Sequence, residues 1–219
     1  YKNIKIIKNW EKNYSMIGII DYGLGNTKAI SNIYDKLKIK NIIIKSKQDF
    51  QKIDNIILPG VGSFDSAIEL LNQSEFLDSI KIHVDEKKKN ILGICVGMQI
   101  FSKESSEGNS LGLGWLDADV KKINLTKDLK KTRLPHMGWN SVKFLKDDPL
   151  FSNINDKEHF YFCHSYYFDC HNQQDIIAET KFSQKFPSVI NKNNIYGIQF
   201  HPEKSHDNGV KILENFSKI

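Results

Sequence analysis

The stretch "NILGICVGMQIF", residues 90–101, combines a short apolar run, a cysteine and two glycines placed symmetrically around that cysteine. Residues 90–94 have the continuous apolar character of a strand buried on both faces, and a helical pattern follows from Cys95. Gly93 and Gly97 each lie two residues from Cys95, which is the spacing of a nucleophile elbow on a sharp strand-to-helix turn. The spacing is also compatible with a core cysteine beside glycines needed for packing. Taken alone, it does not separate the two interpretations.

Strand and helix patterns alternate on both sides of this stretch. Apolar runs predict strands at 16–21, 41–45, 55–59 and 90–94, and helical spacing predicts helices at 26–38, 63–72, 75–89 and from Cys95 onward. After about residue 112 the segments are strand-like with little helix between them, until a last helix at 207–218. This order predicts an α/β fold: a mostly parallel central sheet flanked by helices, with additional antiparallel strands in the C-terminal half.

The length of the chain, 219 residues, fits one domain. We expect a single domain over residues 16–219, because Met16 opens the first strand pattern. Residues 1–15 are predicted to be an N-terminal extension or a remnant of cloning.

Charge and composition exclude several classes of function. The net charge is +5, but the lysines are scattered and form no basic stripe interleaved with aromatics, so no nucleic-acid partner is predicted. No apolar run approaches the roughly 18 residues of a membrane span, and no signal peptide is recognised, so we expect a cytoplasmic protein without a membrane partner. The cysteines, Cys95, Cys163 and Cys170, have no metal-type spacing, so no metal site is predicted. Cys163 and Cys170 are interpreted as packed thiols.

A nucleophilic thiol needs a base, and the base needs a group that orients it. The segment "YGIQFHPEKS", residues 196–205, offers His201 and Glu203 for these roles. Side chains two residues apart share a face in extended backbone, and Pro202 is expected to keep the backbone extended between them. The positive end of the helix after Cys95 would favour the thiolate.

An acyl-transfer site also needs donors for the oxyanion. The backbone N–H of Val96, directly after the nucleophile, is one candidate. The loop "LPGVGSF", residues 58–64, follows a predicted strand at the same sheet edge and could supply the second. Gly60 and Gly62 would let the peptide around Val61 adopt, or flip between, conformations closed to other residues. The alternative is an ordinary glycine-rich turn.

Six motifs in this order resemble the class I (triad) glutamine amidotransferases: "IDYGLGN" (20–26), "LPGVGSF" (58–64), "GICVGMQ" (93–99), "LPHMGWN" (134–140), "YFCHSYY" (161–167) and "GIQFHPEKS" (197–205). Within that family the chain is most similar to the glutaminase subunits of imidazole glycerol phosphate synthase. The resemblance covers nearly all of the chain from Ile17. It implies glutamine as the substrate and no cofactor.

The resemblance also implies roles for individual residues. Cys95 would be the nucleophile, His201 the general base and acid, and Glu203 the orienting carboxylate. The oxyanion would be held at Val96, Val61 and Gly62. Glutamine would be bound by Gly60, Gln99, His164, Ser165 and Tyr166. Met137, Trp139 and Lys204 would face the synthase partner.

In such a pair the partner is a (β/α)8-barrel cyclase, which forms a heterodimer with the glutaminase and uses its ammonia to make imidazole glycerol phosphate and aminoimidazole carboxamide ribotide. An alternative is a paralogous glutaminase that supplies ammonia for amidation of a surface sugar. Two further hypotheses are another cysteine hydrolase with an elbow, such as a peptidase- or chaperone-like relative, and a non-enzymatic regulatory subunit.

Overall fold

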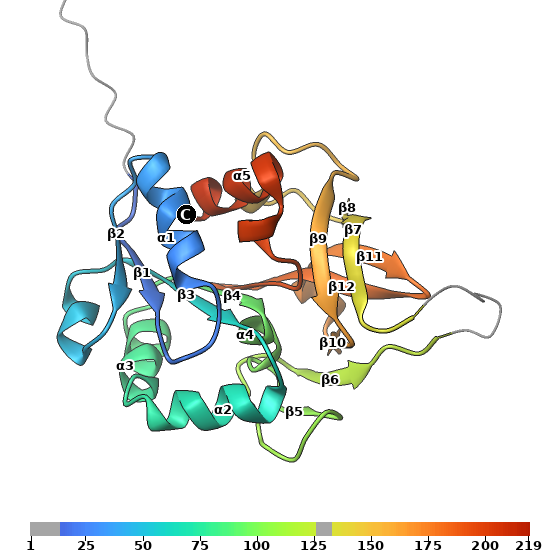
Figure 1. Ribbon diagram of the computed structural model, residues 1–219, viewed down its shortest axis with the longest axis horizontal. Helices are drawn as coiled ribbons and strands as arrows, with labels where there is room; N and C mark the ends of the chain where they lie inside the picture. Colours follow the sequence, from blue (N-terminus) through green and yellow to red (C-terminus); the bar gives the residue numbers. More distant parts are fainter. Residues whose placement is uncertain (1–13, 126–132) are drawn as a thin grey trace, which may run out of the picture.

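The computed structural model describes residues 14–125 and 133–219, and its centre is an eight-stranded sheet (Figure 1). The strands, from one edge to the other, are β2 (Asn41–Ile44), β1 (Ile17–Ile20), β3 (Asn55–Gly60), β4 (Ile91–Cys95), β13 (Ile195–Ile198), β12 (Gln184–Lys192), β11 (Ile176–Phe182) and β8 (Lys143–Phe144). Strands β2, β1, β3, β4 and β13 are parallel, and β12, β11 and β8 continue the sheet in antiparallel pairing. The predicted fold class is confirmed.

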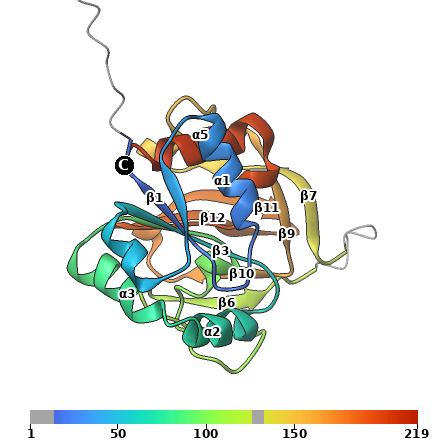
Figure 2. The ribbon, with the colours of Figure 1, turned by 60° about the vertical axis from the view of Figure 1, so that its left-hand side comes forward.

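Helices cover both faces of the parallel half, which is why its strands are apolar along their whole length. Helices α1 (Thr27–Lys36) and α5 (His206–Phe216) lie on one face, and α2 (Phe64–Gln73) and α3 (Leu77–Lys81) lie on the other (Figures 1 and 2). The buried hydroxyl of Tyr34 in α1 donates to the carbonyl of Leu213 in α5 at 3.0 Å, which ties the two helices of one layer together.

The C-terminal half adds two smaller pieces of sheet. Strands β5 (Glu104–Ser105), β6 (Ala118–Lys122) and β10 (Tyr166–Cys170) form one, and β7 (His136–Ser141) pairs with β9 (His159–His164) in an antiparallel ribbon. Short helical turns complete the described chain: η1 (Lys47–Gln51), η2 (Ile82–Glu86, a π turn), α4 (Val96–Gln99), η3 (Pro149–Phe151), η4 (Gln173–Asp175) and η5 (Pro202–Lys204).

The helix predicted from Cys95 onward is a single turn, α4. It ends where the N–H of Phe101 donates to the Met98 carbonyl at 3.0 Å, three residues back, and beyond it the Ile100 and Ser102 carbonyls accept from the N–H groups of Leu113 at 2.7 Å and Gly114 at 2.9 Å. A long-range segment therefore takes the acceptors that a longer helix would need. The helix predicted over 75–89 is likewise divided into α3 and η2.

The predicted extension over residues 1–15 lies mostly outside the described residues. Its last two residues are described and pack on the C-terminal helix: the N–H of Ser15 donates to the Ser217 carbonyl at 2.8 Å, and the Tyr14 hydroxyl donates to Glu214 at 3.2 Å. The single domain over 16–219 remains a prediction. Within residues 14–125 and 133–219, no helix has the length and apolar character required to cross a membrane.

Candidate active site

The site forms where three neighbouring parallel strands end. Register pairs Gly60 at the end of β3 with Cys95 at the end of β4, and Ile198 at the end of β13 with Ile94. The loop after β3 therefore lies on one side of Cys95 and the segment leading to His201 on the other. This is the carboxyl edge of the sheet, where open α/β proteins place their sites.

Cys95 occupies a strained turn. Its backbone has φ of 54° and ψ of −110°, a region that side-chain-bearing residues rarely adopt, and its side chain is buried. The two flanking glycines are needed because the chain is close-packed there. A Cβ on Gly97 would overlap the Leu58 carbonyl oxygen, and one on Gly93 would overlap the Phe101 ring. This geometry matches the elbow that the spacing predicted rather than a relaxed core strand.

His201 and Glu203 meet beside Cys95. Nδ1 of His201 lies 3.0 Å from Oε1 of Glu203, and both side chains are only 3% exposed. The backbone conformation that brings them together differs from the predicted one, because the chain between them is not extended. Pro202 begins the η5 turn, which contains Glu203, and the Ser205 hydroxyl closes the turn by donating to the His201 carbonyl at 2.6 Å.

The charge state of His201 follows from its neighbours. Burial alone would lower the pKa of its imidazole, but interactions with Cys95, and then with Glu203, outweigh burial and raise the pKa to about 10. Both neighbours act as anions that favour the imidazolium. The arrangement can therefore hold a thiolate next to a protonated histidine, which is the form in which cysteine attacks a carbonyl carbon.

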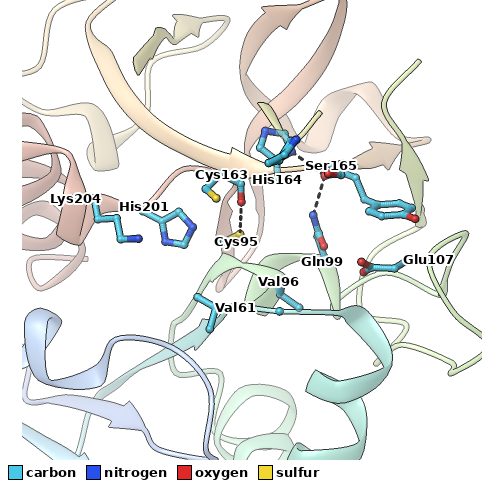
Figure 3. A pocket seen from close by; sticks show the side chains of 13 residues that line it. Val61, Cys95, Val96, Gln99, Glu107, Cys163, His164, Ser165, His201 and Lys204 are labelled. Atoms are coloured by element: carbon cyan, nitrogen blue, oxygen red, sulfur yellow. Dashed lines mark hydrogen bonds between the residues drawn. The ribbon is translucent and has the colours of Figure 1, made fainter. Parts of the chain in front are cut away.

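Cys95 and His201 line a cavity of about 410 Å³, and Glu203 lies behind His201, outside the lining. His201 and Lys204 lie on one side of Cys95, and Gln99 and Glu107 lie on the other (Figure 3). The walls are formed by Val61, Gly62, Cys95, Val96, Gln99, Glu107, Pro135, Cys163, His164, Ser165, Tyr166, His201 and Lys204. The cavity thus has an anionic end and a cationic end with the thiol between them.

Most of the residues predicted to bind substrate lie in this wall, but Gly60 does not. Gly60 is buried at the end of β3, where a Cβ would overlap the N–H nitrogen of Gly97. Gly60 is close-packed behind the elbow, and its role in holding substrate stays a prediction. Val61 is 39% exposed, and Gly62 has φ of +92° with open space around it, so the loop has room to move at the cavity.

The Gln99 side chain, predicted only as a substrate contact, is buried and hydrogen-bonded within the protein. It is 2% exposed, and its Nε2 donates to the Tyr166 carbonyl and to Oε1 of Gln199, both at 3.0 Å. Both amide hydrogens are thus used within the protein, and the amide oxygen is the group left to meet a ligand. The carbonyl of Tyr166 also accepts from Nδ1 of His164 at 2.8 Å, so the wall at this point is held by side chains on both sides (Figure 3).

The three residues predicted to face a partner occupy two places. Met137 and Trp139 lie on β7 and are 61% and 47% exposed. Lys204 lines the cavity itself, and its Nζ lies 5.6 Å from the centre of the Tyr161 ring.

A family model for "Glutamine amidotransferase class-I" matches residues 18–219. The chain belongs to this family. The match takes in all the elements that form the cavity, and the predicted family and enzyme class are confirmed.

Individual proteins of this family are similar to this chain along almost its whole length. The imidazole glycerol phosphate synthase subunit HisH of Leptospira interrogans is 44% identical over 204 residues, which is 93% of this chain and 100% of that protein. The subunit named HisH 2 from Methanococcus maripaludis is 43% identical over 203 residues, 93% of this chain and 99% of its own.

Solved structures of more distant proteins share the fold. One, described as a glutamine amidotransferase from Thermotoga maritima, has a TM-score of 0.61 at 17% identity and covers 87% of this chain and 76% of its own. The PurLQS structure from the same organism has a TM-score of 0.68 at 16% identity, covering 93% of this chain and 97% of its own.

Three groups at or behind the cavity wall of this amidotransferase were not predicted from its sequence. Nε2 of Gln199 lies 3.6 Å from Sγ of Cys95, and the Cys163 carbonyl lies 4.0 Å from the same sulfur. Gln199 could have been found, because it stands two residues before His201 and directly follows strand β13. The Glu107 carboxylate accepts from the N–H of Phe64 at 2.9 Å and lines the cavity from a loop, for which no local pattern gave a signal.

Proposed function

We propose that this chain hydrolyses glutamine to glutamate and ammonia through Cys95, His201 and Glu203, and passes the ammonia to a cyclase partner in histidine biosynthesis. The observation that carries the proposal is that the elbow Cys95 and His201 line one cavity, with the buried Glu203 carboxylate 3.0 Å from Nδ1 of His201. Its support for this substrate is the 44% identity to the HisH subunit from Leptospira interrogans over 93% of the chain.

The reaction begins with attack of the Cys95 thiolate on the carbon of the substrate's side-chain amide. The oxyanion that forms is stabilised by the Val96 N–H, at the N-terminus of α4, and by the peptide around Val61 and Gly62. The His201 imidazolium gives its proton to the departing nitrogen, and the C–N bond breaks. Ammonia departs, and the remaining acyl group is bound to Cys95 as a thioester.

The second half of the reaction uses the same histidine as a base. Neutral His201 takes a proton from water, the resulting hydroxide attacks the thioester carbon, and glutamate leaves as Cys95 returns to the thiolate. Glu203 holds Nδ1 of His201 and stabilises the positive charge each time it forms.

The amino-acid end of glutamine carries a cation and an anion. Glu107 and the free amide oxygen of Gln99, at one end of the cavity, fit the ammonium group. The backbone of His164, Ser165 and Tyr166 borders the same space and would hold the rest of the amino acid.

The Val61 peptide is proposed as the switch through which a partner controls turnover. Removing one oxyanion donor costs about 3–4 kcal/mol of barrier, or roughly 100- to 1000-fold in rate. Rotation of this peptide, allowed by Gly62, would therefore turn the reaction on or off. Isolated chain is expected to turn over slowly, with a large rise when the cyclase and its ligand are added.

The partner is proposed to be a (β/α)8-barrel cyclase, and the heterodimer face to include Met137, Trp139 and Lys204. The exposure of Met137 and Trp139 supports this face. Ammonia released to water would become ammonium and lose its nucleophilicity, so transfer has to be direct.

Glutamate release is the primary test. Wild-type chain should release glutamate from glutamine in the presence of the cyclase, and Cys95→Ala should release none above background. Cys170→Ala, which removes a buried thiol outside the cavity, is the matched control and should behave as wild type. Peptidase turnover without glutamine consumption would instead indicate a different cysteine hydrolase, and equal activity in Cys95→Ala would reject the mechanism.

The acceptor needs a separate test. The complex is supplied with amide-¹⁵N glutamine and an excess of unlabelled ammonium, and the imidazole product is analysed for ¹⁵N. Retention of the label supports direct transfer to the cyclase. A chain that binds no cyclase but restores amidation of a surface sugar would place the ammonia in the alternative pathway.

A further inference from the structure

A line of side-chain hydrogen bonds runs from strand β7 into the wall of the cavity. Register pairs His136 of β7 with His164 of β9, so their side chains lie on the same face of the ribbon. Both are buried, at 3% and 6% exposure, and Nδ1 of His136 lies 2.9 Å from Nε2 of His164. Two buried imidazoles in contact require one to donate and the other to accept.

The direction of each bond follows from its end point. The Tyr166 carbonyl can only accept, so the hydrogen of His164 is on Nδ1, which lies 2.8 Å away. Nε2 of His164 then has no hydrogen and can only accept. Nδ1 of His136 must therefore carry the hydrogen that lies between the two rings. Nε2 of His136 is therefore an acceptor as well, and the amide nitrogen of Asn140 lies 3.1 Å from it.

Independent observations agree with these assignments. The Asn140 amide is oriented by its oxygen, which accepts from the N–H of Ser141 at 2.8 Å, so its nitrogen is the atom that faces His136. Burial lowers the pKa of His164 to about 3 and that of His136 to about 4, and the charges of His136 and His201 act in the same direction on His164. Each ring is thus neutral at pH 7, with one donor and one acceptor.

The far end of the line reaches the reacting sulfur. The Tyr166 carbonyl, held by His164, also accepts from Gln99, and Gln99 donates to Gln199, whose Nε2 lies 3.6 Å from Sγ of Cys95. The carbonyl is therefore the junction between the histidine pair and the cavity. Loss of either donor would leave the Tyr166 carbonyl with one side-chain partner in place of two, next to the segment over 163–166 that lines the cavity.

The position of His136 within β7 connects this line of hydrogen bonds to the exposed surface of the same strand. Met137 and Trp139 point to solvent from the same strand, whereas His136 points inward. Its ring stacks on Phe162 and on Phe182, with centroid separations of 4.8 and 4.0 Å. The ring is thus held in orientation by packing as well as by hydrogen bonds.

We propose that His136 is a positioning residue for the glutamine pocket: its Nδ1–H holds His164 in the Nδ1–H tautomer, and His164 with Gln99 then fixes the Tyr166 carbonyl. The exposed strand with Met137 and Trp139 is thereby linked to the cavity wall. This role rests on the proposed glutaminase function.

The test replaces the donor while keeping the shape. His136→Phe retains the stacking but leaves the His164 lone pair without a donor, whereas His136→Asn returns an N–H near the position of Nδ1. With the cyclase present, His136→Phe should raise the KM for glutamine about 10-fold, with kcat within about threefold of wild type. His136→Asn should restore the KM, and unchanged KM in a folded His136→Phe protein would overturn the proposal.

Packing is separated from hydrogen bonding by a matched variant. Phe182→Leu removes a ring that stacks on His136 but breaks no bond of the line, so it should lower the melting temperature without raising the KM. An equal rise of KM in Phe182→Leu would assign the effect to packing and overturn the proposal. If His136→Phe does not fold, Asn140→Ala breaks the preceding bond at a half-buried position, and the expected KM rise is about threefold; no rise would count against the role.

A spectroscopic measurement does not depend on turnover. Histidine ¹⁵N NMR of the wild-type chain should report His164 as the neutral Nδ1–H tautomer, and the Nε2–H tautomer would overturn the proposal. Absence of glutamine hydrolysis in wild type, with the Nδ1–H tautomer present, would instead count against the proposed function while leaving the His136–His164 bond in place.

Discussion

The amide nitrogen of Gln199 lies 3.6 Å from Sγ of Cys95, and its amide oxygen accepts from Gln99 at 3.0 Å. Gln199 is completely buried, so its amide is oriented by Gln99 and presents its N–H to the sulfur. A donor in this place favours the thiolate over the thiol, since hydrogen bonds to a charged form stabilise that form.

Gln199→Met, which keeps the length of the side chain but removes the donor, should lower kcat by about 10-fold, because a hydrogen bond to a charged group contributes about 1.5–3 kcal/mol. Alkylation of Cys95 by iodoacetamide should slow in parallel. Gln184→Met changes a glutamine that bonds to the N–H of Asn124 and does not line the cavity, and it is the control. Equal kcat in both variants would show that Gln199 does not act on the sulfur.

The charge on His201 predicts a characteristic pH dependence of thiol reactivity. Because Cys95 and Glu203 raise the pKa of His201 to about 10, its positive charge persists across pH 6 to 9 and disappears only as the pH rises through that value. Alkylation of Cys95 should therefore be faster in wild type than in His201→Asn across pH 6 to 9, because the imidazolium stabilises the attacking thiolate, and this difference should shrink above pH 10. Equal alkylation rates in the two proteins across pH 6 to 9 would contradict an ion pair.

The elbow glycines should be intolerant of a methyl group. Gly97→Ala places a Cβ onto the Leu58 carbonyl and should cost about 3 kcal/mol in free energy of unfolding, at the upper end of overpacking penalties. Gly114→Ala is the comparison: its φ of +66° is also unfavourable for alanine, but no atom lies within 4 Å. It should cost only about 1 kcal/mol. Urea unfolding measures both, and a Gly97→Ala protein as stable as Gly114→Ala would refute the close approach.

The buried histidine pair should make the fold sensitive to mild acid. Because burial lowers the pKa of His136 to about 4 and that of His164 to about 3, the unfolded chain binds more protons than the native chain below pH 6.5. Stability therefore rises with pH through this window and is lost as the pH falls, at about 1.4 kcal/mol per pH unit for each histidine.

His136→Phe removes one of these two groups, so the loss of unfolding free energy between pH 6.5 and 5.5 should shrink by about 1 kcal/mol. Urea unfolding at both pH values measures it. His159→Asn, at an exposed position, controls for the removal of a histidine as such. The same pH difference in wild type and His136→Phe would mean that the ring is not neutral in the native state.

Local patterns predicted the fold class well because each buried parallel strand is a run of consecutive apolar residues. The elbow was also predicted, since Gly93, Cys95 and Gly97 form it within five positions of the chain. The length of the helix after Cys95 was not, because residues 112–114 take the carbonyls that would continue it. Helical spacing cannot reveal an acceptor claimed by a distant segment.

The His201–Glu203 pair also shows where prediction from local sequence patterns stops. Their proximity was predicted from spacing, but the reason given, an extended backbone, was wrong: the η5 turn and the Ser205 hydroxyl bring them together. Gln99 was predicted as a substrate contact, but its amide hydrogens are committed to Tyr166 and Gln199.

The sequence by itself determined the elements of this protein and the chemical identity of its reactive groups. Strand patterns, the elbow glycines and the His-Pro-Glu segment each depend on residues close together in the chain. Only the tertiary structure decided which groups meet, because the register of β3, β4 and β13 places Val61, Cys95 and His201 at one sheet edge. It also decided the proton positions in the His136–His164 pair, since a tautomer depends on the partner that each nitrogen finds across the fold.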